Sequence, residues 1–378
     1  MFDRPALRRT RSRNAAHAVL AALALAAIAP EAAAIGRTFV ASFGLDTNAC
    51  SLSSPCRGFT AALVQTDPGG EIVVLDSAGY GAVTIGKSVS IVVPAGIYAG
   101  ISVLAGDGIT INGAGINVTL QGLTINGQGG DHGVRFVQGA RLNVAGCQIS
   151  SMGGNGVRVE GAGTVVVTQT SIVGSGQEGV FVNAAANVSV VRSRISSSAG
   201  TGIEMTGGAS GSVTRSLVSD NGLFGIEALQ TTAGTTRIAI DDTTITDNDA
   251  ATGIYAEGSG ASAIAQIDIT NSLVTRNFNG IFAFSQGSGT ATIGSTGNDI
   301  VENLQTGVST ATTGSTTIVA ASKNGVFRNA VAGFVQSSGS LFTPCTTNPC
   351  GATPVFTNYV SDNAGGDNFG ATPDPSIQ

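Results

Sequence analysis

The sequence is poor in charged and aromatic residues. Its 378 residues contain no tryptophan, 5% aromatic residues, 11% charged residues and two histidines. Lys87 and Lys323 are the only lysines, and the formal net charge is −6 at pH 7. A chain with so few cations lacks the positive surface that nucleic acids and anionic membranes require, so partners of both kinds are excluded.

The longest apolar run lies near the N-terminus, from Ala15 to Ala29, and is short of the ~20 residues that span a membrane. Five arginines precede it, and the small residues Ala32 and Ala34 follow. This pattern predicts a signal peptide over residues 1–34, with a membrane anchor as the alternative. Its removal leaves 18 − 5 = 13 basic and 24 − 2 = 22 acidic residues, a net charge of −9. We expect an exported, periplasmic or extracellular protein with no transmembrane segment after signal removal.

What the chain has in abundance is a repeat built on its 54 glycines. A glycine followed by a β-branched residue, a variable residue and an apolar or small residue returns from Gly108 to Gly333. From Gly133 to Gly225 the interval is 23 residues, and the later intervals are 26 to 28. A period of this size indicates a solenoid. We expect the glycine to supply a positive φ before each strand, and the extra residues of the late repeats to form projecting loops.

A second phrase occupies a fixed place in each period. It has apolar residues at i and i+2, then a small polar residue, then an apolar one, as in Leu142, Val144, Cys147 and Ile149. Alternation and β-branched residues indicate strands with one buried face. Leucine is scarce and no helical spacing intervenes, which argues against a leucine-rich repeat. The prediction is an all-β, right-handed parallel β-helix with three-strand coils of about 23–28 residues.

These phrases, with the turns that carry the later asparagines, resemble the repeats of right-handed parallel β-helix proteins of the pectate-lyase-like superfamily. The resemblance implies that the outer face of the Gly-led strands forms a substrate groove. It also implies an internal side-chain ladder formed by Cys147, Thr170, Ser193, Ser216, Thr243 and Ser272. The Asp-Pro-His-Asp motif of alginate epimerases is missing, so the resemblance assigns no catalytic residue. The late asparagines are Asn221, Asn248, Asn277, Asn303 and Asn329.

The predicted solenoid covers residues 71–340, between two caps. Residues 35–70 form the N-terminal cap, with a short helix over Arg57–Gln65 that covers the open end of the stack. Residues 341–378 form a C-terminal cap and tail. In an exported protein the close cysteines predict two disulfides, Cys50–Cys56 and Cys345–Cys350, with a four-Cys zinc site as the alternative. Cys147 is predicted to be a buried structural thiol.

Because side chains alternate on a strand, the residues two and four after each glycine point outward. Rings and carboxylates on such a face are typical of sugar-binding surfaces, whereas the alternative is that late loops cover the rings as a small separate core. We predict a monomer that binds a polysaccharide or cell-surface glycan there. A non-catalytic structural or adhesive surface rod is the alternative. The predicted substrate-binding residues are Arg135, Arg158, Phe181, Tyr255, Glu257 and Phe282.

Two clusters are candidates for catalysis by a polysaccharide lyase or glycoside hydrolase. Glu204 and Glu227 occupy equivalent places on adjacent coils, so their carboxyls can approach ~5 Å, as in retaining glycoside hydrolases. Repulsion between two such close carboxylates would raise the pKa of one of them, so that one carboxyl serves as an acid and the other as a base. In the second cluster, Arg135 and Arg158 would neutralise a uronate carboxylate while a base, with His132 as the candidate, removes the adjacent proton. The residues of this cluster are Asp131, His132, Arg135, Arg158 and Glu160. The alternative is that the carboxylates are solvated and the histidine is structural.

No cofactor is expected. Four acidic residues, Asp241, Asp242, Asp247 and Asp249, are dense enough to suggest Ca²⁺, which prefers several oxygen ligands. The alternative is that they are solvated turn residues, since the second pair lies one strand away from the first. The sequence therefore predicts no defined metal site.

Overall fold

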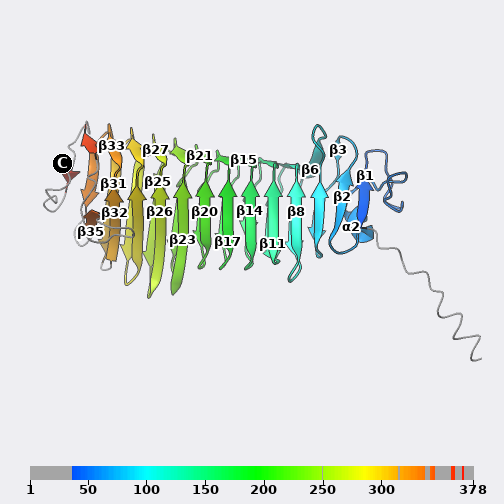
Figure 1. The fold of residues 1–378 in the computed structure, drawn as a ribbon, viewed down its shortest axis with the longest axis horizontal. Coiled ribbons are helices and arrows are strands. Elements are labelled where there is room, and N and C mark those ends of the chain that lie inside the picture. The colour runs from blue at the N-terminus through cyan, green and yellow to red at the C-terminus, as the bar shows by residue number, and fades with distance from the viewer. Residues whose placement is uncertain are drawn as a thin grey trace, which may run out of the picture. The chain divides into compact units, whose positions relative to one another are not determined.

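The computed structural model describes residues 36–248, 250–313 and 316–336, and the backbone of 341–344, 359–361 and 368–369. The predicted signal peptide and the Cys345–Cys350 pair lie outside these residues. The described chain begins at Gly36 and is one compact unit. Its strands form three parallel sheets with one strand of each sheet per coil, which confirms the predicted parallel β-helix. Figure 1 shows the strands of successive coils side by side, starting from β1.

The sheet that carries the Gly-led strands, called the Gly-led sheet below, has 12 strands. They are β4 (Val83–Ile85), β7 (Ile109–Asn112), β10 (Val134–Gln138), β13 (Val157–Val159), β16 (Val180–Asn183), β19 (Ile203–Thr206), β22 (Ile226–Gln230), β25 (Thr252–Ser259), β28 (Asn279–Gln286), β31 (Thr306–Thr313), β34 (Ala332–Gln336) and β37 (Asn368–Phe369).

The second sheet has 13 strands. They are β1 (Arg37–Val40), β2 (Gly70–Val74), β5 (Val89–Val92), β8 (Asn117–Gln121), β11 (Arg141–Ala145), β14 (Thr164–Thr168), β17 (Asn187–Val191), β20 (Ser210–Thr214), β23 (Gly234–Asp241), β26 (Ala263–Thr270), β29 (Thr290–Thr296), β32 (Thr316–Ser322) and β35 (Leu341–Pro344).

The third sheet has 12 short strands. They are β3 (Ala78–Gly79), β6 (Ala99–Val103), β9 (Thr124–Gly127), β12 (Gln148–Ser150), β15 (Ser171–Val173), β18 (Arg194–Ser196), β21 (Leu217–Ser219), β24 (Thr244–Thr246), β27 (Leu273–Thr275), β30 (Asp299–Val301), β33 (Gly325–Phe327) and β36 (Tyr359–Ser361).

The register of the Gly-led sheet is the predicted one. Val157, Val180 and Ile203 are aligned on neighbouring strands and are completely buried. The next residue of each strand points away from this core and is half-buried. Because side chains alternate on a strand, this alignment places every second residue of each Gly-led strand on one outer face.

The glycines before these strands are required for a reason other than the predicted one. Gly156 and Gly179 do not have positive φ. A Cβ on Gly156 would lie 2.2 Å from Cγ2 of Ile172 and 2.7 Å from the carbonyl oxygen of Gly179. The prediction of a left-handed conformation is wrong. The coil turns so closely against its neighbours that no side chain fits.

The late coils also differ from expectation. The extra residues of these longer repeats lengthen the strands, since β25, β26 and β28 each have eight residues. The predicted projecting loops are therefore largely strand. The extra residues extend two facing sheets together, and so the added backbone groups pair with the next coil instead of remaining exposed.

Two ladders of polar side chains run inside the turns. The predicted hydroxyl ladder is present, because Thr170 accepts from the backbone N–H of Cys147 and Ser193 accepts from that of Thr170. It continues into Asn298 and Asn324. A second ladder is made by the late asparagines, in which each Oδ1 accepts from the amide one coil earlier. The asparagine ladder is thus at a different turn from the hydroxyl ladder.

The N-terminal cap has the predicted parts. Helix α2 (Phe59–Gln65) buries Phe59, Ala62 and Leu63 and contacts β1, β2 and β4. Cys50 and Cys56 form the predicted disulfide, and Cys147 is a buried free thiol. In the described part of the chain, no helix is long and apolar enough to cross a membrane.

Candidate functional site

The candidate site lies on the outer face of the Gly-led sheet, between β10 and β28. The predicted residues Arg135, Arg158, Phe181 and Glu204 are half-buried on successive strands. Farther along the column Glu227 is only 7% exposed, and Tyr255 is 8% exposed. The column therefore changes from a cationic and accessible part to an acidic, aromatic and more enclosed part.

At the cationic end, the two arginines share one carboxylate. Nε of Arg135 donates to Oε2 of Glu160 at 2.9 Å, and Nε of Arg158 donates to Oε1 at 2.6 Å. Asp107 lies 3.6 Å from Nη1 of Arg135. Burial alone would raise the pKa of Glu160, but the hydrogen bonds from the two guanidinium groups lower it overall. Glu160 is therefore an ionised bridge, and sequence reasoning placed it correctly beside the arginines.

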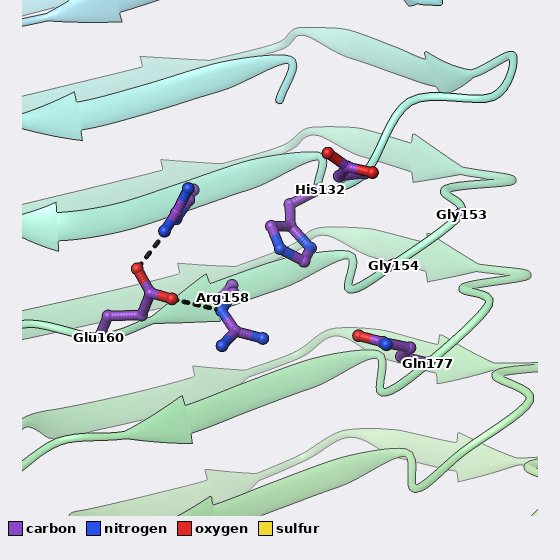
Figure 2. A pocket seen from close by; sticks show the side chains of 8 residues that line it. His132, Gly153, Gly154, Arg158, Glu160 and Gln177 are labelled. Atoms are coloured by element: carbon purple, nitrogen blue, oxygen red, sulfur yellow. Dashed lines mark hydrogen bonds and ion pairs between the residues drawn. The ribbon is translucent and has the colours of Figure 1, made fainter. Parts of the chain in front are cut away.

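A pocket of about 340 Å³ opens next to this bridge, as Figure 2 shows. In the figure, the His132 ring lies between the turn at Gly154 and the Arg158 side chain. The lining residues are Asp131, His132, Arg135, Gly153, Gly154, Arg158, Glu160 and Gln177. The pocket thus brings together the residues of the predicted His132 cluster.

His132 is held as a neutral hydrogen-bond donor. Its Nδ1 accepts the backbone N–H of Asn155 at 3.0 Å, so the ring proton is on Nε2. Burial lowers the pKa of His132, and Arg158 and Arg135 lower it further against the opposing effect of Asp107. With Nδ1 occupied and Nε2 protonated, the ring is arranged to donate a hydrogen bond. The arrangement does not favour the predicted role as a proton-abstracting base.

Asn155 links the pocket to the acidic part of the face. This completely buried residue donates from Nδ2 to Oε2 of Glu178 at 2.7 Å and accepts from Nη1 of Arg158 at 3.2 Å. Arg158 also lies over the ring of Phe181, 5.0 Å from its centroid. The cationic and acidic parts are therefore one connected surface.

Glu204 and Glu227 are direct neighbours across β19 and β22. Adjacent strands are about 4.8 Å apart, so the two carboxyls are close to each other. Burial, followed by the charge of Glu178, raises the pKa of Glu204 to about 7. Burial, followed by the charge of Glu204, raises the pKa of Glu227 to about 8, against a hydrogen bond of 3.2 Å from Thr201. Near neutral pH this pair holds protons that solvated carboxyls would release.

The aromatic residues gather at the far end of the face. Tyr255 stacks on Phe224 with 4.2 Å between ring centroids and lies 5.6 Å from Phe282. Its hydroxyl donates to Glu257 at 2.8 Å, and burial with this bond raises the pKa of Tyr255. Phe224 covers Tyr255. For this ring, the structure agrees with the alternative in which the rings form a small separate core instead of a sugar-binding surface. Phe282 and Phe284 remain half-buried, so the groove hypothesis keeps these two rings.

Sequence reasoning missed a second column on this face. The residue immediately before each glycine supplies Asn155, Glu178, Thr201 and Phe224 to the site, and of this column only His132 was predicted. These residues recur with the same 23-residue period, one position before each glycine, so the sequence does contain a pattern that could have identified them. The turn directs these side chains toward the outward residues of the following strand.

The acidic turn residues do not form a shared site. Both oxygens of Asp247 accept from Arg276, at 2.6 and 2.8 Å, whereas Asp241 accepts from Thr270 and Asn271. Asp249 lies outside the described residues. Among the residues that the structure describes, no three His, Cys, Asp or Glu side chains are grouped as metal ligands.

The comparisons with known proteins agree with this architecture. A family model described as a right-handed beta helix region matches residues 132–296. The family model and the three parallel sheets define the fold of the chain as a right-handed parallel β-helix. A sequence search finds no match among curated proteins.

Two solved structures illustrate the similarity in fold. The A-module of the mannuronan C-5 epimerase AlgE4 from Azotobacter vinelandii is 13% identical with a TM-score of 0.58, over 81% of this chain and 90% of that module. An alginate lyase from Paenibacillus sp. str. FPU-7 is 16% identical with a TM-score of 0.50, over 80% of this chain and 98% of that one.

Proposed function

We propose that the protein binds a polysaccharide along the outer face of the Gly-led sheet, from the His132 pocket to the rings on β28. The observation that carries this proposal is the continuity of the surface. Consecutive in-register strands carry the parts of this surface. These parts are the His132 pocket, the two arginines bridged by Glu160, the Glu204–Glu227 pair and the aromatic residues. A linear ligand crossing the strands meets one new side chain about every 4.8 Å, close to the length of one sugar unit.

The side chains suit a sugar. Half-buried rings such as Phe181 and Phe282 present apolar surface to the C–H side of a sugar ring. Protonated Glu204 and Glu227 both donate and accept hydrogen bonds, as sugar hydroxyls require. Solved β-helix structures with this fold include a mannuronan C-5 epimerase and an alginate lyase, which supports a polysaccharide as the ligand class. The disulfide in the N-terminal cap supports export, because such bonds persist in oxidising compartments.

A binding assay tests the proposal. We expect at least one polysaccharide among galactomannan, xyloglucan, dextran, alginate and polygalacturonate to bind. Phe181→Ala and Phe282→Ala should each weaken that binding by about tenfold, the equivalent of one lost ring contact. Val166→Ala is the matched control, because Val166 is a half-buried outward residue of the second sheet. Unchanged affinity in both Phe variants would contradict the proposed face, and no binding at all would favour the structural rod.

Cleavage of a glycosidic bond is the second candidate function. The observation that favours it is the pairing of Glu204 with Glu227, because two adjacent carboxyls with raised pKa values can supply a proton and a charge to the same bond. In this scheme Glu227, with the higher pKa, is the acid, and Glu204 is the carboxylate.

A further inference from the structure

We propose that the bound polysaccharide carries no acidic groups, and that the His132 pocket binds the hydroxyls of an uncharged sugar unit. The inference rests on the proposed function and names its substrate class. It separates this protein from the mannuronan C-5 epimerase and the alginate lyase that share its fold. Three features of the face support it: the pairing of its arginines, the neutral state of its histidine and the excess of carboxyls.

The arginines of the pocket have little positive charge to offer a ligand. Arg135 lies between Glu160 and Asp107, and Arg158 donates to the other oxygen of Glu160. The side chain of Glu160 is 24% exposed, so its ion pairs are partly shielded from water. A carboxylate of an incoming uronate would have to compete with Glu160 for both guanidinium groups. Arg158 keeps Nη2 for a neutral acceptor, since Nε and Nη1 donate within the protein.

His132 adds a donor without a charge. Its position depends on Gly154, where a Cβ would lie 2.6 Å from Nδ1 of the imidazole. Because Nδ1 accepts from the backbone, the ring presents Nε2–H and stays neutral. A neutral donor beside an already paired guanidinium matches a hydroxyl oxygen, which accepts and needs no counter-charge. The pocket volume of about 340 Å³ accommodates one sugar unit.

The rest of the face is acidic. On the Gly-led strands from β16 to β25 and in the turn before β16, the charged residues of this face are carboxyls: Glu178, Glu204, Glu227 and Glu257. Each raises the pKa of a neighbour, as Glu178 does for Glu204 and as Glu204 does for Glu227. A polymer with one carboxylate per sugar would bring like charges against Glu178 and Glu257, whose charges already help to keep protons on Glu204 and Glu227. An uncharged polymer meets no such repulsion.

Comparison of neutral and acidic polysaccharides at two salt concentrations tests the inference. We expect galactomannan, xyloglucan or dextran to bind at least tenfold more tightly than alginate or polygalacturonate. The affinity for the neutral polymer should change less than twofold between 50 and 500 mM NaCl, because no charge pairs form on binding. Tighter binding of a polyuronate that weakens with salt would overturn the inference and leave the proposed function standing. Failure of all five polymers to bind would remove both.

Two variants make the test specific to the pocket. Glu160→Gln removes the shared carboxylate, so polygalacturonate should then bind at least tenfold more tightly at 50 mM NaCl than it binds the wild type. Glu302→Gln is the control, because Glu302 makes a comparable ion pair with Arg328 in an exposed position. Gln177→Trp, from an exposed position on the pocket wall, should weaken neutral-polymer binding at least tenfold. No gain in Glu160→Gln together with no loss in Gln177→Trp would contradict the assignment.

Discussion

Replacement of Glu227 by Gln is expected to stabilise the protein at pH 8 and to change its stability little at pH 4. The folded protein holds the pKa of Glu227 at about 8, well above the 4.5 of a solvated carboxyl. Between these values the unfolded chain releases a proton that the folded chain keeps, so stability falls as pH rises. Gln cannot ionise and still accepts the hydrogen bond from Thr201. The gain at pH 8 should be about 2–4 kcal/mol.

Urea unfolding of wild type and variant at pH 4 and pH 8 measures this difference. At pH 4 the carboxyl is mostly protonated in both states, so wild type and variant should have similar midpoints there. Asp268→Asn is the control, since Asp268 is an exposed outward residue of the second sheet, and it should show no comparable gain at pH 8. An equal shift at both pH values, or a loss at pH 8, would contradict the raised pKa.

The same substitution separates stability from function. If the carboxyl pair cleaves a polysaccharide, Glu204→Gln and Glu227→Gln should each reduce the release of new reducing ends by about 10²–10⁴-fold, the usual contribution of general acid–base catalysis. Both variants should stay folded, because the amide is close in shape to the carboxyl. Full activity in both variants would exclude the pair from catalysis.

Replacement of Asn277 by Ala is expected to destabilise the late coils strongly. Oδ1 of Asn277 accepts from the backbone N–H and Nδ2 of Asn248, at 3.2 and 2.7 Å, and its Nδ2 donates to the carbonyl oxygen of Thr275 at 3.0 Å. Alanine removes these bonds from a completely buried turn and leaves the backbone N–H of Asn248 without its acceptor, whereas Nδ2 of Asn248 keeps its bond to Thr246. With about 1–3 kcal/mol for the unpaired N–H and about 1 kcal/mol for each further bond lost, the loss should be about 3–5 kcal/mol.

Thermal unfolding followed by circular dichroism measures this effect as a fall in Tm. Asn187→Ala is the control, because Asn187 is an exposed residue at the start of β17, and it should change Tm little. Equal effects of the two substitutions would mean that the asparagine ladder contributes nothing specific to the stack.

The fold could be predicted from the sequence because each coil repeats the same physical requirement. A strand with one buried face must alternate, and so Val157, Val180 and Ile203 already identify the interior. The ladder of small polar residues from Cys147 to Ser272 was predicted by the resemblance to known β-helix repeats, and it agrees with the need of buried backbone groups for partners at every coil. The role of the glycines was misassigned, because the contact with the next coil that excludes a Cβ at Gly156 is visible only in three dimensions.

The site was predicted only in part. The outward column followed from strand alternation, which placed Arg158 and Glu204 correctly. The turn residues Asn155 and Phe224 were missed, because no alternation rule says where a turn side chain points. Their contacts decide the chemistry: Asn155 sets the tautomer of His132 through its backbone, and Phe224 covers Tyr255. The burial that raises the pKa of Glu227 likewise depends on these neighbours.

The central claim, that a polysaccharide lies across the Gly-led sheet, is tested most directly by hydrogen exchange with and without the neutral polymer that binds best. We expect slower amide exchange in the turns and strands of 153–160, 176–183 and 200–206, and unchanged exchange in β14, β17 and β20 of the second sheet. Protection confined to the second sheet, with none in the Gly-led strands at saturating ligand, would contradict the account.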